Sequence, residues 1–253
     1  MTLRDLANLA LSRIFAPPCV ACGHPIPQPL DGAVCEACWS RVVPFTPPLC
    51  ANCGIPLASW RAAEHMALCC ARCHRNPGVL DRQAAVGPYE GVLRDVLHAL
   101  KYDGRRSVAP MLSVRMRSAG RDLFEAVSLA VPVPLHRRRQ WRRGFNQADL
   151  LAVGLGLPTS RLLRRVRATP PQVTLPAAAR RHNVRDAFRL SIDEARRITG
   201  RADTRLDGLV LMLVDDVATT GATLEACARV LKEAGADEVR AVTAARVVSA
   251  PRR

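Results

Sequence analysis

The chain has 253 residues, of which 49% are hydrophobic, 37 are Lys or Arg and 22 are Asp or Glu, so its formal net charge is +15. This apolar share can bury a core and, with 19 prolines and 15 glycines spread along the chain, it excludes intrinsic disorder, collagen and coiled coil. No run approaches the roughly 18 uncharged apolar residues that a membrane-spanning helix needs.

The first residues predict a short amphipathic helix rather than a signal peptide. Asp5 and Arg13 interrupt the apolar stretch, and no small-x-small cleavage site follows it. One face of the expected helix carries Leu3, Leu6, Ala10 and Ile14. We therefore expect a cytoplasmic protein.

Nine of the ten cysteines lie within residues 19–73, and eight of these form four Cys-x2-Cys pairs. Such a turn brings two thiolates to one side of the chain, and two turns complete a tetrahedral zinc site. Gly23 and Gly54 each follow the second cysteine of a pair, where a residue without a Cβ permits the turn. The predicted zinc ligands are Cys19, Cys22, Cys35, Cys38, Cys50, Cys53, Cys70 and Cys73.

The alternative interpretation of these cysteines is a disulfide framework, but that would require export, and the chain shows no export signal. Two zinc ions are expected, and both are structural because catalytic zinc keeps an open position and usually takes His or carboxylate ligands. The spacing favours neither tandem pairing, which gives a double zinc ribbon over residues 15–76, nor interleaved pairing. We expect Cys69 to be a spare thiol and Cys227 to lie in the core.

From about residue 80 the chain alternates between strand and helix patterns. Residues 209–214 form a continuous apolar run, which is typical of a central parallel strand buried on both faces. In chain order the expected elements are strand 84–89, helices 91–102 and 105–120, strand 127–133, helix 145–157, strands 161–166 and 209–214, helix 222–234 and strand 239–248. This order predicts an α/β domain over residues 80–250, with helices on both faces of the sheet.

The basic residues are concentrated in the middle of this second domain. Residues 132–197 carry 15 arginines against four acidic residues, a net of +11, whereas residues 1–76 carry six against four, a net of +2. The ratio of 35 arginines to 2 lysines is typical of a GC-rich genome, but codon bias does not explain the positions of the arginines. The central segment predicts attraction to a polyanion such as phosphate, pyrophosphate or nucleic acid.

The strand at 209–214 leads directly into Asp215 and Asp216 and then into the loop Ala-Thr-Thr-Gly-Ala-Thr over residues 218–223. Open α/β sheets bind ligands at the carboxyl ends of their strands, and a loop entering a helix N-terminus suits a phosphate monoester. Two adjacent carboxylates repel each other unless ribose hydroxyls or Mg²⁺ bridge them. The alternatives are an NTPase strand end, weakened by the lack of a G-x4-G-K-[ST] motif, and a pair of helix-capping aspartates.

Residues 214–223 resemble the 5-phosphoribosyl-1-diphosphate (PRPP) binding motif of type I phosphoribosyltransferases. Three further blocks make the chain similar to the ComF family, including its GntX-like members, and the double zinc ribbon belongs to the same pattern. The resemblance covers roughly residues 15–248. The blocks are Tyr89-Glu-Gly91 with Lys101-Tyr-Asp-Gly104, Val131–Arg139 with Arg143-Gly-Phe-Asn-Gln147, and Arg165–Gln172 with Arg181 and Asn183-Val184.

This resemblance implies a Rossmann-like sheet of the phosphoribosyltransferase type, flanked by helices and preceded by the small double zinc ribbon. It implies that Asp215 and Asp216 are the catalytic pair, which contacts the ribose hydroxyls and hydrated Mg²⁺. The residues expected around the 5-phosphate are Ala218, Thr219, Thr220, Gly221, Ala222 and Thr223.

The resemblance also implies which residues surround the diphosphate. The stretch from Arg137 to Arg143 follows a strand, where such folds place the pyrophosphate loop, although a solvated surface face is the alternative. Residues 167–185 are expected to form a flexible loop over PRPP. The diphosphate ligands expected from it are Arg167, Gln172 and Arg181, and Lys101 is a further phosphate candidate.

Three functions follow from these observations. The first is a ComF-type protein that binds PRPP and Mg²⁺, with or without transferase activity, and assists single-stranded DNA entry at the inner membrane face beside competence proteins. The second is a phosphoribosyltransferase of nucleotide salvage or metabolism, which requires neither zinc ribbons nor the basic segment. The third is a zinc-ribbon nucleic-acid-binding protein with an inactive transferase fold, which the intact Asp215–Thr223 motif argues against.

Overall fold

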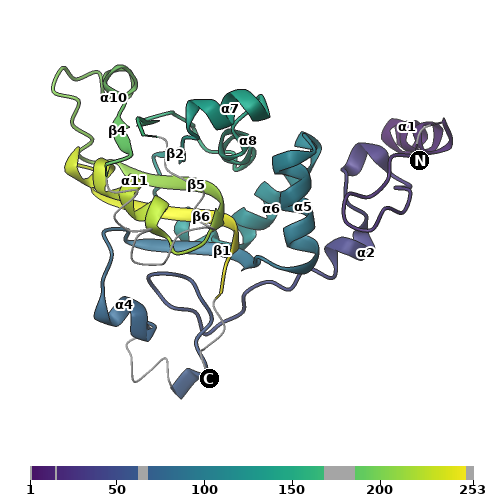
Figure 1. The fold of residues 1–253 in the computed structure, drawn as a ribbon, viewed down its shortest axis with the longest axis horizontal. Helices are drawn as coiled ribbons and strands as arrows, with labels where there is room; N and C mark the ends of the chain where they lie inside the picture. Colours follow the sequence, from purple (N-terminus) through teal and green to yellow (C-terminus); the bar gives the residue numbers. More distant parts are fainter. Residues whose placement is uncertain (1, 15, 62–67, 168–185, 249–253) are drawn as a thin grey trace.

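The computed structural model describes residues 2–14, 16–61, 68–167 and 186–248 (Figure 1). Its central sheet has four parallel strands in the order β1 (Arg82–Pro88), β6 (Glu238–Arg246), β5 (Val210–Ala218) and β2 (Leu129–Pro132). A separate antiparallel pair consists of β3 (Leu163–Arg165) and β4 (Phe188–Leu190). The predicted α/β class with a parallel sheet is confirmed.

Helices cover both faces of the sheet, as predicted. One core contains Met212 and Val214 of β5 and packs beneath α5 (Gly91–Tyr102), α6 (Ala109–Ala119) and α8 (Gln147–Gly154). The other contains Leu211 and Leu213 and packs beneath α10 (Ile192–Thr199) and α11 (Ala222–Glu233). Successive side chains of β5 therefore point into the cores on opposite faces of the sheet. Because both faces are buried, the chain is apolar without interruption over residues 209–214. Other helical segments among the described residues of this domain are the short 3-10 helices η2 (Arg106–Val108) and η3 (Arg121–Leu123) and the α-helix α7 (Arg137–Arg143).

Two segments differ from the predicted elements, namely the end of strand β5 and the basic stretch at residues 137–143. Strand β5 does not end at residue 214: main-chain pairing continues until Ala218 stands opposite Arg246, so both aspartates lie inside the strand. The basic stretch expected as a loop is helix α7, which His136 caps by accepting a hydrogen bond from Arg138 N at 3.3 Å. Gly144, with a φ of 77°, ends this helix in the left-handed conformation that glycine adopts most readily.

The cysteine-rich segment folds as two ribbons with the same local geometry. The first ribbon is residues 16–41, with η1 (Pro29–Asp31) and α2 (Glu36–Trp39), and the second is the described part of residues 48–76, with α4 (Ala71–Arg75). Gly23 N donates to Cys19 O and Gly54 N to Cys50 O, both at 2.8 Å. Both glycines have positive φ, 75° and 64°, as their place in the turn predicts.

Each ribbon packs on a different part of the α/β domain. In the first, the Trp39 ring lies 3.8 Å from the Arg115 guanidinium carbon of α6. In the second, Asn52 O accepts a hydrogen bond from Gln83 N of β1 at 2.9 Å, and a Cβ on Gly54 would lie 2.4 Å from Gln83 O. Gly54 therefore both turns the knuckle and lets the second ribbon approach the edge of the sheet.

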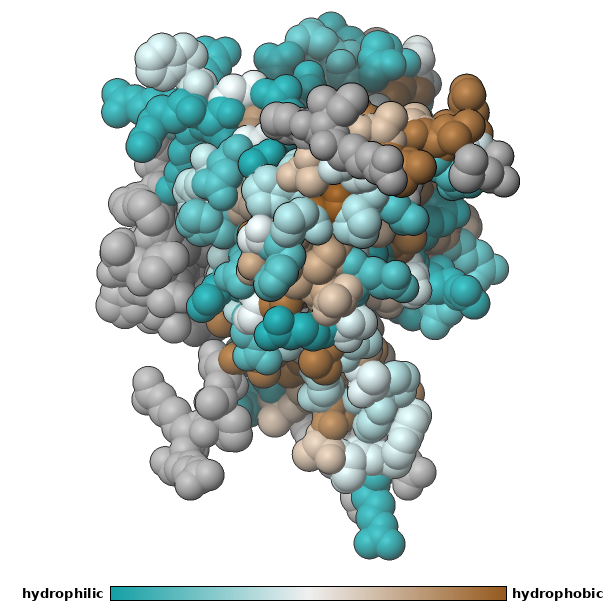
Figure 2. Space-filling model, turned by 90° about the vertical axis from the view of Figure 1, so that its right-hand side faces the viewer, coloured by the Kyte–Doolittle hydropathy of each residue, from teal (hydrophilic) through white to brown (hydrophobic). Residues whose placement is uncertain are grey.

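The amino-terminal helix α1 (Leu3–Ile14) forms as predicted and is fastened to the first ribbon by a polar contact. Asn8 is buried, and its Oδ1 accepts from Leu30 N at 2.9 Å. Leu3, Leu6, Leu9 and Leu11 are exposed, and hydrophobic side chains gather on the upper part of this end of the molecule, at the level of α1 (Figure 2). Among the described residues, no helix is both long and apolar enough to cross a membrane.

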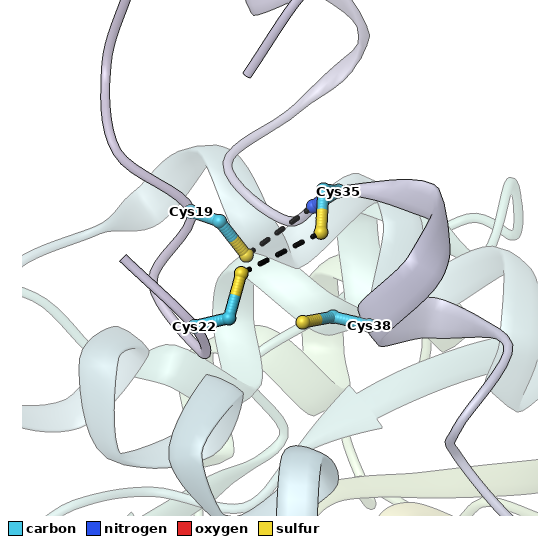
Figure 3. A group of neighbouring side chains, drawn as sticks. All are labelled: Cys19, Cys22, Cys35 and Cys38. Atoms are coloured by element: carbon cyan, nitrogen blue, oxygen red, sulfur yellow. Dashed lines mark hydrogen bonds between the residues drawn. The ribbon is translucent and has the colours of Figure 1, made fainter. Parts of the chain in front are cut away.

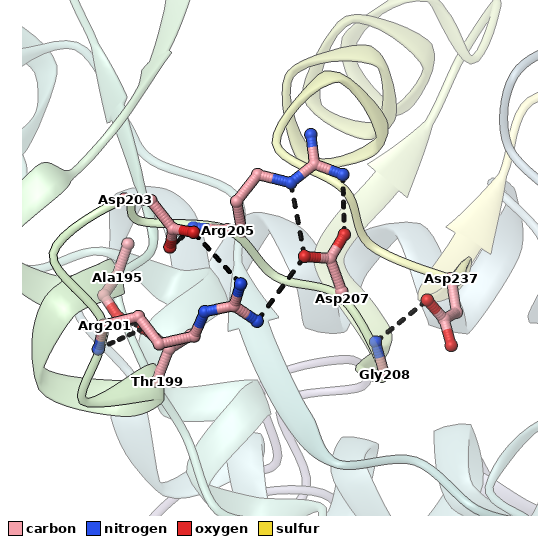
Figure 4. Close-up of polar contacts among 8 residues, drawn as sticks. All are labelled: Ala195, Thr199, Arg201, Asp203, Arg205, Asp207, Gly208 and Asp237. Atoms are coloured by element: carbon pink, nitrogen blue, oxygen red, sulfur yellow. Dashed lines mark hydrogen bonds and ion pairs between the residues drawn. The ribbon is translucent and has the colours of Figure 1, made fainter.

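The loop between α10 and β5 carries a cluster of surface ion pairs (Figure 4). Arg201 lies 3.0 Å from Asp203, and Arg205 bonds both carboxylate oxygens of Asp207, at 3.2 and 2.6 Å. These side chains are about half exposed, so each pair stabilises the fold little. The opposite charges of these side chains cancel one another near the amino end of β5. They therefore lie far from the carboxyl end of this strand.

Candidate functional site

A cavity of about 660 Å³ opens at the carboxyl edge of the parallel sheet. Strands β5 and β2 end beside it, and helix α11 begins there. Its wall contains seven of the sequence-predicted site residues, namely Lys101, Asp215, Asp216, Ala218, Thr219, Gly221 and Thr223. The topology explains this convergence because parallel strands deliver the residues that follow them to one edge.

The two aspartates of β5 form the acidic floor of the cavity. Asp216 is 5% exposed, and its Oδ2 lies 2.8 Å from Lys101 Nζ of α5, with no further hydrogen-bond donor among the described residues. Burial raises the pKa of Asp215 well above its usual range, and repulsion from Asp216 adds to the rise. Burial alone would lower the pKa of Lys101, but the Asp216 carboxylate outweighs it and the pKa is raised.

The threonine loop, which we define as residues 218–223, connects β5 to the first turn of α11. Gly221 caps this helix with a φ of 80°, a conformation that L side chains rarely adopt. Thr220 Oγ1 accepts from Ala222 N at 3.3 Å, which orders the helix entrance. Thr220 and Ala222 are not among the described residues that line the cavity. The other four residues of the threonine loop line it, and Thr220 and Ala222 help to hold the loop in shape.

Four arginines, which we call the arginine group, line the same cavity: Arg139, Arg142, Arg143 and Arg165. Arg143 lies 5.4 Å from the centre of the Tyr102 ring and donates to Gln147 Oε1 at 2.5 Å. The Arg165 guanidinium lies 5.3 Å from the centre of the Phe188 ring, and burial lowers its pKa. Guanidinium groups are well suited to bind phosphate oxygens, so these four cations favour an anionic ligand in this part of the cavity.

The arginine group only partly overlaps the arginines expected from the sequence. Arg137, at the first position of α7, and Arg167, which is exposed after β3, do not line the cavity, and Gln172 and Arg181 lie outside the described residues. Positions 139, 142 and 143 fall on one helical face at spacings of three and four, a signal visible only once the stretch is recognised as a helix. Tyr89 and Tyr102 also line the cavity, and Lys101 Nζ lies 5.7 Å from the centre of the Tyr89 ring.

The eight predicted zinc ligands form two clusters, paired along the chain. Cys19, Cys22, Cys35 and Cys38 make one (Figure 3), and Cys50, Cys53, Cys70 and Cys73 make the other. The ligand atoms within each cluster all lie within 4.8 Å of one another. This geometry resolves the pairing that the spacing left open, in favour of tandem ribbons.

The sulfur geometry fits zinc. Sγ atoms of Cys22 and Cys35 are 3.7 Å apart, as are those of Cys53 and Cys70. Four thiolates bound tetrahedrally at ~2.3 Å from zinc stand ~3.8 Å apart. Cys69, the expected spare, is outside the cluster and contacts Asn52 Oδ1 at 2.9 Å, and Cys227 is buried in the core as expected. The two clusters therefore indicate two structural zinc sites.

Two family models match the chain. One, described as a double zinc ribbon domain, matches residues 10–76, and the other, described as a phosphoribosyl transferase domain, matches residues 142–252. These matches agree with the zinc clusters and with the α/β sheet.

Several curated relatives match most of the chain. DNA utilization protein YhgH of Salmonella typhimurium is 36% identical over 220 residues, which are 82% of this chain and 87% of the relative. Competence protein F of Haemophilus influenzae is 32% identical with the same coverage. Competence protein ComFC of Bacillus subtilis is 28% identical over 208 residues, 81% of this chain and 80% of the relative.

Proposed function

The chain belongs to the ComF family, whose relatives are named for competence and DNA utilization, and from that premise we propose that it binds PRPP with Mg²⁺ and assists DNA uptake. One observation carries the proposal. A single cavity at the carboxyl edge of the sheet combines two aspartates, the threonine loop and the arginine group.

The arrangement suits the chemical parts of PRPP. The 5-phosphate is a monoester, and it matches the threonine loop at the amino end of α11. The ribose hydroxyls can donate to the carboxylates of Asp215 and Asp216. The diphosphate then faces the arginine group, whose planar guanidinium groups bind phosphate oxygens in pairs.

Mg²⁺ suits the acidic floor because it prefers oxygen ligands and keeps several waters. Asp215 and Asp216 would hold it, and it would supply positive charge beside the departing diphosphate in a phosphoribosyl transfer. Lys101, paired with Asp216 at 2.8 Å, supplies positive charge at the same place from the chain itself. A screen for pyrophosphate release over nucleobase acceptors separates a transferase from a protein that binds PRPP without transfer.

Replacing Asp215 by asparagine is expected to weaken PRPP binding at least tenfold, about the worth of one charge-assisted contact. Titration calorimetry with PRPP and excess Mg²⁺, on wild type and Asp215→Asn, measures the effect. Asp193→Asn, which removes an exposed carboxylate of α10, is the matched control and should bind as the wild type does. No PRPP-dependent heat from the wild type would reject the proposed site.

The DNA part of the proposal rests on the names of the relatives and on the basic segment. Residues 132–197 have a net charge of +11. Only four of their 15 arginines belong to the arginine group that lines the cavity. If the remaining arginines contact DNA phosphates, the affinity for single-stranded DNA must fall steeply as salt rises. Fluorescence anisotropy with an oligonucleotide over a salt series measures this slope, and equal binding at low and high salt would contradict an electrostatic DNA site.

A further inference from the structure

The second ribbon contacts the threonine loop directly. Arg72 of α4 donates a hydrogen bond from Nη2 to Thr220 O, across 148 positions of sequence. Arg72 stands between the predicted zinc ligands Cys70 and Cys73, so a metal held by these thiolates fixes the backbone that carries it. The carbonyl of Thr220 is part of the loop that turns the chain into α11, and a bond there restrains the shape of the loop.

A second connection runs through the end of strand β6. Arg246 is 3% exposed, and its Nη1 donates to the carbonyl of the zinc ligand Cys53 at 3.0 Å and to Gln83 Oε1 at 2.7 Å. Its neighbour Val247 donates from N to Ala218 O at 2.8 Å. The first residue of the threonine loop is therefore tied to a residue that the second ribbon holds in place.

A third connection reaches the first turn of α11. Glu225 Oε2 accepts from Val79 N at 2.8 Å, just after the second ribbon ends. Gly78 makes this approach possible, because a Cβ at that position would lie 2.0 Å from Glu225 Oε1. The loop and the helix it enters are thus fastened at three points to residues in or beside the second ribbon.

The first ribbon provides an internal comparison. Its cysteines repeat the geometry of the second, with Cys35 and Cys38 standing where Cys70 and Cys73 stand, so Ala37 occupies the position of Arg72. The alanine side chain has no hydrogen-bond donor to replace the Arg72 guanidinium. The first ribbon instead packs on α6 through Trp39 and Arg115.

We propose that the second zinc ribbon is a support for the threonine loop, with Arg72 as a positioning residue, so that PRPP binding and zinc retention in the second ribbon are coupled. The inference rests on the proposed PRPP function. Coupling between two sites is reciprocal, so the ribbon that strengthens PRPP binding must itself hold zinc more tightly when PRPP is bound. The metal of the first ribbon, which packs elsewhere, serves as the reference.

The test compares Arg72→Ala with Arg75→Ala, which removes the same charge from the same short helix. Arg75 bonds Ala71 O within α4, at 3.2 Å. By calorimetry with PRPP and Mg²⁺, Arg72→Ala is expected to bind five- to tenfold more weakly, about the effect of losing one charge-assisted hydrogen bond, whereas Arg75→Ala stays at the wild-type affinity. Arg72→Lys, which keeps a charged donor, should recover part of the loss.

A second measurement is the rate of zinc release with and without PRPP. A variant that is merely less stable would release zinc faster under both conditions, without losing the effect of PRPP. In wild type, saturating PRPP with excess Mg²⁺ should slow release of one of the two zinc ions to a zinc-selective chelator about fivefold, within the usual range of coupling between sites. This protection should disappear in Arg72→Ala and remain in Arg75→Ala.

The outcomes separate the inference from the function on which it rests. Equal PRPP affinity and equal zinc protection in wild type and Arg72→Ala would overturn the inference and leave the proposed function standing. An equal loss in both arginine variants would overturn it in favour of an effect of net charge. Absence of any PRPP-dependent heat from the wild type would overturn both.

Discussion

Asp216→Asn is expected to lower the free energy of unfolding by about 3 kcal/mol, because it leaves the Lys101 ammonium buried without its counter-charge. The side chains of Lys101 and Asp216 are 15% and 6% exposed and are separated by 2.8 Å, so solvent compensates little for the loss. The variant should also lose PRPP binding, since one of the two carboxylates at the floor of the cavity is gone. Urea denaturation followed by circular dichroism measures the change in stability.

Two controls identify the cause of that destabilisation. The double variant Lys101→Met with Asp216→Asn removes both charges and is expected to return to within about 1 kcal/mol of the wild type. Asp95→Asn breaks an exposed pair with Arg94 on the same helix and should change stability by less than about 0.5 kcal/mol. A double variant that remains as unstable as Asp216→Asn would contradict the ion-pair explanation.

Cys70→Ser is expected to lower the zinc content from two ions per chain to one and to unfold the second ribbon. A structural zinc contributes about 10 kcal/mol to the folding of a small module, and the second ribbon buries few apolar residues besides its cysteines. Atomic absorption on the purified protein gives the zinc content, and a thermal scan gives the loss of stability.

The adjacent thiol provides the matched control. Cys69 lies beside Cys70 in sequence but outside the cluster, so Cys69→Ser should keep two zinc ions per chain and a melting temperature close to that of the wild type. Two zinc ions in Cys70→Ser, or one in Cys69→Ser, would show that the ligands are not those of the two clusters.

The elements that bury a continuous apolar face could be predicted from the sequence. Helix α5 spans the predicted residues, and α11 forms within the predicted residues 222–234 and buries Leu224 and Leu231. The end of β5 could not be predicted in this way. Its last four residues remain in the strand because β6 supplies main-chain partners, although the charged side chains of Asp215 and Asp216 suggest that the strand has ended.

Of the candidate site, too, only the part that depends on local sequence could be predicted. The motif at Asp215–Thr223 follows from local sequence, and residues from it line the cavity. The arginine group depends on helix α7 and on strand β3, which carries Arg165. The strand was predicted at residues 161–166, but helix α7 and the partner strand β4 were not. The contact between Arg72 and Thr220 joins two segments far apart in the chain, and no local pattern marks it.

The most direct test of the PRPP site is the ³¹P spectrum of PRPP with Mg²⁺ in the presence of the protein. PRPP gives separate resonances for its 5-phosphate and for the two phosphorus atoms of its diphosphate. If the threonine loop and the arginine group bind the two ends of one molecule, all three resonances should broaden or shift together, and Asp215→Asn should reduce the effect. Three resonances unchanged by a stoichiometric amount of the wild-type protein would contradict the account.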